Sequence, residues 1–69
     1  MRTYRYIKTR KTSEVDFINL VSKCVRIGIS FSYDSEQGFV ETINISDYDK
    51  KELDLFIKQN GVDLESVEK

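Results

Sequence analysis

The sequence predicts a small two-layer α+β domain in which one face of an antiparallel sheet is covered by two helices. Three observations support this prediction. Residues 13–27 and the segment after residue 46 carry apolar side chains at helical spacing. Residues 29–33 alternate apolar and polar side chains, as a half-buried strand does. A polar turn with a glycine then leads into a second strand, so the expected order is βαββα.

The first predicted strand spans residues 3–9. It contains Tyr4, Tyr6 and Ile7, which are residue types that favour a pleated, half-buried surface. The phase of this strand stays open, because the two tyrosines point to one face and Ile7 points to the other. A polar connection follows and leads to the first helix.

The first predicted helix begins after Ser13, a favourable N-cap residue, and has Glu14 and Asp16 in its first turn. Its apolar stripe has the spacing i, i+3, i+4, i+7 and consists of Phe17, Leu20, Val21 and Cys24, widened by Ile18 and Val25. We expect the helix to end near Ile27, with Gly28 as the left-handed residue that closes it. An alternative is a helix that ends near Cys24 and a strand that starts at Val25.

A β-hairpin is predicted next. In its first strand, Ile29, Phe31 and Tyr33 alternate with serines. Asp34 suits the first position of a turn, and Gly38 supplies the positive φ that closes a hairpin. The return strand covers residues 39–45. Its expected inner face holds Phe39, Ile43 and Ile45, and also Glu41 unless Glu41 lies at an edge. Its expected outer face holds Val40, Thr42 and Asn44.

Ser46 or Asp47 is expected to cap the second helix, whose narrow inner stripe is Leu53, Phe56 and Ile57. Gly61 follows as the closing residue. The acidic residues 63–69 are expected to form a tail that frays. The chain, taken as a single domain over residues 1–69, thus resembles a ferredoxin-like βαββαβ unit whose last strand is missing or vestigial. A likeness of fold carries no function with it.

Composition argues against a disulfide, a zinc site and a membrane span. The chain of 69 residues has one cysteine and no histidine, so zinc ligands and an intrachain disulfide are excluded. It has no apolar run long enough to span a membrane and begins without the apolar region of a signal peptide. We therefore expect a cytoplasmic protein with a free thiol. The lack of Ala, Pro, His and Trp is typical of AT-rich coding, as in low-GC bacteria and their phages.

The sequence offers few residues that are suited to catalysis. Histidine, the usual general base near neutral pH, is absent. Cys24 falls on an apolar stripe and is expected in the core. The acidic cluster of Asp47, Asp49 and Glu52 lies at a helix start, where capping and the helix dipole account for it. We expect no enzyme, no cofactor and no metal.

The basic N-terminal segment is a candidate nucleic-acid contact. Cations contact phosphates, and aromatic rings stack on bases. In RNA-recognition sheets such rings lie on the first and third strands, which here would combine Tyr4 or Tyr6 with Phe39. The candidate residues are Arg2, Tyr4, Arg5, Tyr6, Lys8, Arg10 and Lys11. The competing interpretation places both tyrosines in the core, and the acidic pI of about 5.3 favours it.

Charge is divided unevenly along the chain. Residues 1–33 carry seven basic and two acidic side chains, a net charge of +5, and residues 34–69 carry four basic and ten acidic ones, a net charge of −6. Such asymmetry bears on partners rather than on fold. The acidic half is compatible with mimicry of nucleic acid, but an ordinary solvated surface is the simpler interpretation.

The outer face of the sheet is the second candidate site. It is predicted to be a flat surface of small side chains, namely Ser30, Ser32, Val40, Thr42 and Asn44. An antiparallel sheet can leave such a face in water, or it can receive another chain that stabilises a small domain. The sequence thus predicts a non-catalytic binding or regulatory protein that acts as a homodimer or on a larger host partner. A nucleic-acid-binding module is the alternative, and the sequence does not identify the partner.

Overall fold

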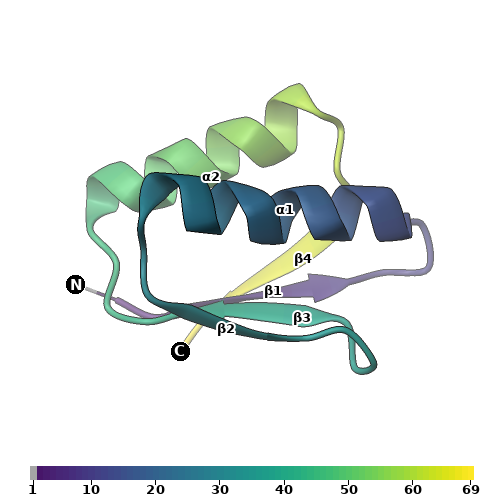
Figure 1. The fold of residues 1–69 in the computed structure, drawn as a ribbon, viewed down its shortest axis with the longest axis horizontal. Coiled ribbons are helices and arrows are strands. Elements are labelled where there is room, and N and C mark those ends of the chain that lie inside the picture. The colour runs from purple at the N-terminus through teal and green to yellow at the C-terminus, as the bar shows by residue number, and fades with distance from the viewer. Residues whose placement is uncertain (1) are drawn as a thin grey trace.

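The first two strands form where apolar residues alternate along the chain, and the helices form where they recur every three to four residues. The computed structural model describes residues 2–69. Over these residues the elements are β1 (Tyr4–Lys8), α1 (Glu14–Ile27), β2 (Phe31–Asp34), β3 (Phe39–Thr42), α2 (Asp47–Gln59) and β4 (Leu64–Glu68). They form a small α+β domain with a four-stranded antiparallel sheet and two helices. The strand order is β2-β3-β1-β4, and both helices lie on one side of the sheet (Figure 1).

Both helices begin where capping chemistry predicts. The hydroxyls of Ser13 and Ser46 each accept a bond, at 3.1 Å, from the backbone N–H three residues further on. At the end of α1, Gly28 adopts a left-handed φ of 73°. The N–H of Ile29 then donates to the C=O of Cys24, which is the predicted Schellman closure.

The turn between β2 and β3 closes as predicted. The carboxylate of Asp34 accepts bonds from the N–H groups of Glu36 and Gln37, both at 2.9 Å. Gly38 has a φ of 74°, and a Cβ at this position would lie 3.0 Å from a carbon of Lys8. Glycine is therefore favoured here by its backbone angle and by the close approach of the neighbouring strand.

The two faces of β3 are reversed relative to the prediction. Val40 and Thr42, expected on the outer face, lie under the helices with 0% of their surface exposed. Side chains alternate along a strand, so Phe39 and Glu41 point to the open side of the sheet. The assignment failed because both faces of this strand carry apolar residues.

An irregular segment after β3 accounts for this error. The hydroxyl of Thr42 accepts a bond from the N–H of Tyr4 at 3.1 Å and donates to its C=O at 3.3 Å. Asn44 follows with a left-handed φ of 50°, and Ile45 then returns to the core. A one-residue slip moves the following side chains to the opposite face. The slip returns Ile45 to the core, whereas Ile43 keeps the alternation of Phe39 and Glu41 and is exposed, although it was expected to share the inner face with Ile45.

The C-terminal segment forms a strand, so the expectation of a missing or vestigial last strand is wrong. All five residues of β4 pair antiparallel with β1, and they belong to the segment, residues 63–69, that was expected to fray. Leu64 and Val67 are the only apolar residues of β4, so its sequence alone gives a weak strand signal. Backbone pairing and opposite charge compensate, since Glu68 accepts a bond from Arg2 at 3.4 Å.

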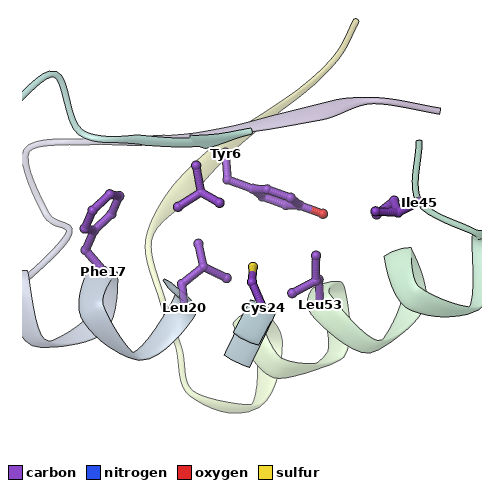
Figure 2. Close-up of a cluster of buried hydrophobic side chains, with 7 residues drawn as sticks. Tyr6, Phe17, Leu20, Cys24, Ile45 and Leu53 are labelled. Carbon is purple, nitrogen blue, oxygen red and sulfur yellow. The ribbon is translucent and has the colours of Figure 1, made fainter. Parts of the chain in front are cut away.

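The core lies between the sheet and the two helices. Its buried apolar side chains are Tyr6, Phe17, Leu20, Cys24, Val40, Ile45 and Leu53. Figure 2 shows the ring of Tyr6 between β1 and the helices, facing Cys24 and Leu53, with its hydroxyl directed toward Ile45. Its hydroxyl donates to Oδ1 of Asp54 at 3.3 Å, which satisfies the polar end of the ring. Of the two possible orientations of β1, the structure therefore has the one in which the tyrosines face the helices.

Candidate interaction surfaces

The tyrosines of the predicted nucleic-acid contact lie on the covered face of the sheet. Tyr6 is buried, and Tyr4 is half-buried against the core. The ammonium of Lys50 covers both rings, at 4.6 Å from the centroid of Tyr4 and 5.4 Å from that of Tyr6. Phe39 points to the opposite face, so it cannot join either tyrosine in one stacking platform. The candidate RNA-recognition-like combination of these rings does not form, and the competing interpretation, which places the tyrosines against the core, is confirmed.

Three cations of the same segment take part in ion pairs. The pairs are Arg2–Glu68, Arg5–Glu41 and Lys8–Glu14. The first two join the basic first half of the chain to the acidic second half, so the uneven charge is partly neutralised inside the molecule. Surface pairs of this kind contribute little to stability, but they lower the positive potential of the segment. Arg10 and Lys11 lie exposed in the turn before α1.

The open face of the sheet carries a cluster around Arg5. The guanidinium carbon lies 4.4 Å from the centroid of the Phe39 ring. Arg5 also donates to Oε2 of Glu41 at 3.2 and 2.7 Å, and Nζ of Lys69 donates to Oε1 at 3.2 Å. The bonds from Arg5, followed by those from Lys69, hold the pKa of Glu41 below its ordinary value. Sequence reasoning missed this cluster because it placed Phe39 on the inner face.

The predicted protein interface is divided between surface and core. Ser30, Ser32 and Asn44 are exposed, as expected. Val40 and Thr42 are fully buried, so their assignment to an interface is wrong. Aromatic and charged side chains occupy the open face in their place, and the predicted flat surface of small residues does not form.

Another surface combines exposed apolar side chains with an unpaired strand edge. Helix α1 exposes Ile18 and Val25 to 59% and 64%, and β2 exposes Tyr33 to 55%. Ile18, Val21 and Tyr33 line a hollow of about 210 Å³ between helix and strand. Strand β2 is the outermost strand at this edge of the sheet. We call this surface the α1–β2 flank and define it by Ile18, Val21, Val25, Phe31 and Tyr33.

A signal for this flank was present in the sequence. The apolar stripe of α1 is wider than the stripe of α2, because Ile18 and Val25 extend it to one side. In the structure, Phe17, Leu20 and Cys24 are the buried residues of α1, whereas Ile18 and Val25 stay exposed. The extension therefore marks a second surface of the helix, a distinction that periodicity alone does not make.

A second apolar site lies on the outer surface of α2. Tyr48 and Leu55 are exposed there and, with Lys51 and Lys58, line a hollow of about 360 Å³. The lining residues all belong to one helix, and no strand contributes a backbone edge among them. Leu55 of this site is therefore a matched control position for the α1–β2 flank.

The thiol of Cys24 is placed for packing. It is fully buried, and burial raises its pKa to about 11. A thiol with such a pKa is protonated near neutral pH and is a poor nucleophile. Between residues 2 and 69, no three His, Cys, Asp or Glu side chains gather in a way that could hold a metal ion. Neither helix of this part of the chain has the length and apolar character to cross a membrane.

The chain was compared with protein-family models, curated proteins and solved structures. No protein-family model, no curated protein and no solved structure matches this chain significantly.

Proposed function

We propose that this chain is a small, non-catalytic binding and regulatory protein that engages another protein chain through the α1–β2 flank. One observation carries the proposal: exposed apolar side chains of α1 lie beside the unpaired edge of β2. Apolar side chains offer burial to a partner. The free N–H and C=O groups of an edge strand offer it hydrogen bonds. Together they favour a protein partner over a small molecule.

A non-catalytic role is supported by the residues available for chemistry. The sequence has no histidine, and its one cysteine is buried with a raised pKa. A free cysteine also suits the reducing cytoplasm, which we propose as the location.

The nucleic-acid-binding module stays the alternative proposal. It is less well supported, because Tyr6 is buried and because Arg2, Arg5 and Lys8 are ion-paired. An electrostatic contact through Arg10 and Lys11, which are exposed, is the form of this alternative that the geometry still permits.

At the level of fold, we propose a ferredoxin-like relationship. The element order βαββαβ and the antiparallel pairing of β1 with both β3 and β4 support it. The antiparallel pairing of β2 with β3 completes the arrangement. The relationship says nothing about the partner.

The test is a pull-down from a lysate of the source cell with the immobilised wild-type chain and two matched variants. Ile18→Glu places a carboxylate on the flank, and Leu55→Glu places one on the exposed surface of α2. Both positions are about half exposed or more, so both variants should fold. We expect a protein partner, the chain's own copies included, that survives nuclease and is lost only with Ile18→Glu.

Equal capture by all three chains would contradict the proposed function. A partner that disappears with nuclease and weakens steeply with salt would favour the nucleic-acid alternative.

A further inference from the structure

The free edge of β2 presents a self-complementary set of backbone groups. Across the β2–β3 ladder, the N–H of Ile43 donates to the C=O of Ser30 at 2.9 Å. Backbone groups alternate in direction along an antiparallel strand. Those of Ser30 and Ser32 therefore point toward β3, and the N–H and C=O groups of Phe31 and Tyr33 point to the free edge.

We propose that the occupant of the α1–β2 flank is a second copy of this chain, held by antiparallel pairing of the two β2 strands about a two-fold axis. The inference rests on the proposed protein-binding function and names the partner. In this register Ser32 lies opposite Ser32 of the second copy, at the axis. Phe31 of each copy lies opposite Tyr33 of the other. Every outward-pointing N–H and C=O of these two residues is then bonded across the axis.

The helix layer agrees with the same axis. Ile18 and Val25 are seven residues apart, so they lie on one side of α1 about two turns from each other. The axis sets the α1 helices of the two copies antiparallel, with Ile18 of one near Val25 of the other and Val21 between them. The exposed apolar residues of both layers are thus covered by one contact.

Charge complementarity supports a second copy as the occupant. The first turn of α1 carries Glu14, which lies on the side of the flank and also pairs with Lys8, and the last turn carries Arg26. In an antiparallel pair, the acidic start of each helix lies beside the basic end of the other. This arrangement is favourable for the side-chain charges and for the helix dipoles.

The opposite edge of the sheet lacks these features. Strand β4 has Glu65 and Glu68 among its five residues, and charged side chains commonly protect an edge from pairing. Strand β2 has Asp34 alone, at its end, and the proposed register places it opposite Ser30. Self-pairing of β2 therefore brings no like charges directly together.

The experiment is disulfide cross-linking through Ser32→Cys, with Ser30→Cys, just before β2 and on the same face, as the matched control. In the proposed register the α-carbons of position 32 lie about 4.5 Å apart, within reach of a disulfide. In the same register, position 30 lies opposite position 34 of the second copy. The two copies of position 30 are therefore four residues, or about 13 Å, apart along the strand direction. Cys24 does not interfere, because it is buried.

Under a mild oxidant we expect Ser32→Cys to form a covalent dimer at least about tenfold faster than Ser30→Cys, because only its thiols reach each other. Sedimentation should show a reversible dimer of the wild-type chain. Ile18→Glu should raise the dimer dissociation constant about 100-fold, because both copies of a two-fold symmetric dimer carry the substitution in the interface.

Equal cross-linking of the two cysteine variants would overturn the inference. So would a wild-type chain that stays monomeric up to about 1 mM. If that monomer still binds a different protein that Ile18→Glu abolishes, the second copy is refuted and the protein-binding function stands. If it binds none, both proposals fail.

Discussion

The covered and open faces of the sheet are built from the same alternating strands, yet they differ in what surrounds each side chain. On the covered face, Tyr6, Val40 and Thr42 are enclosed by helices. On the open face, Phe39 is covered instead by the guanidinium of Arg5. Apolar character therefore does not say which way a strand residue points. On β3, the smaller side chains of Val40 and Thr42 lie under the helices, and the larger ring of Phe39 is shielded by a charged neighbour on the other face.

The open face and the flank also differ in whether their side chains and backbone groups already have partners. On the open face, Arg5, Glu41 and Lys69 are engaged with one another. On the flank, Ile18 and Val25 lie exposed beside a strand with an unpaired edge. A partner gains apolar burial and new backbone bonds at the flank, whereas at the open face it would have to desolvate charges that already have partners.

The largest expected difference between the faces concerns two aromatic side chains. Tyr6→Ala should lower the free energy of unfolding by about 3–5 kcal/mol, because it leaves a cavity in the core. Phe39→Ala should lower it by about 1–2 kcal/mol, because that ring is only partly buried. Circular dichroism measures both, from the urea midpoint for Phe39→Ala and from the loss of folded signal without urea for Tyr6→Ala.

The core of so small a domain supplies only about 3–5 kcal/mol, so Tyr6→Ala is expected to be largely unfolded. Tyr6→Phe, which removes only the bond to Asp54, serves as the control and should cost about 0.5–1.5 kcal/mol. A larger loss for Phe39→Ala than for Tyr6→Ala would mean that the faces are assigned the wrong way round.

A smaller effect is expected at Cys24, which packs against the covered face. Cys24→Ser should lower the free energy of unfolding by about 1–3 kcal/mol, because it buries a hydroxyl without a partner. Cys24→Ala, which adds no polar group, should cost less. Binding per folded molecule should be unchanged in both. Loss of binding at unaltered stability would show that the thiol has a functional role.

The smallest effect concerns the pH dependence contributed by the open face. The pKa of Glu41 is lowered by Arg5 and Lys69, so the ionised form stabilises the fold. This contribution is present above the unfolded pKa of about 4.3 and is lost as the pH falls through the lower folded value. Glu41→Gln should therefore flatten the acid limb of stability against pH, measured by urea midpoints at low salt. Glu36→Gln, in the exposed turn, is the control, and identical curves for wild type and Glu41→Gln would contradict the assignment.

Local chemistry made much of the fold predictable. Ser13 and Ser46 cap helices, and Gly28 and Gly38 close a helix and a hairpin, as expected. Each of these features depends on bonds between residues only a few positions apart. The position of Cys24 in the core followed from helical spacing in the same way.

Contacts between distant segments decided the rest. Strand β4 forms because β1, from the other end of the chain, pairs with it. The phase of β3 depends on the bond between Thr42 and Tyr4, which lie 38 positions apart. The candidate sites changed with these contacts: Val40 and Thr42 moved into the core, and the surplus apolar side of α1 came to lie beside the edge of β2. A sequence specifies the apolar faces of its elements, but which face is covered depends on the space that the other elements leave.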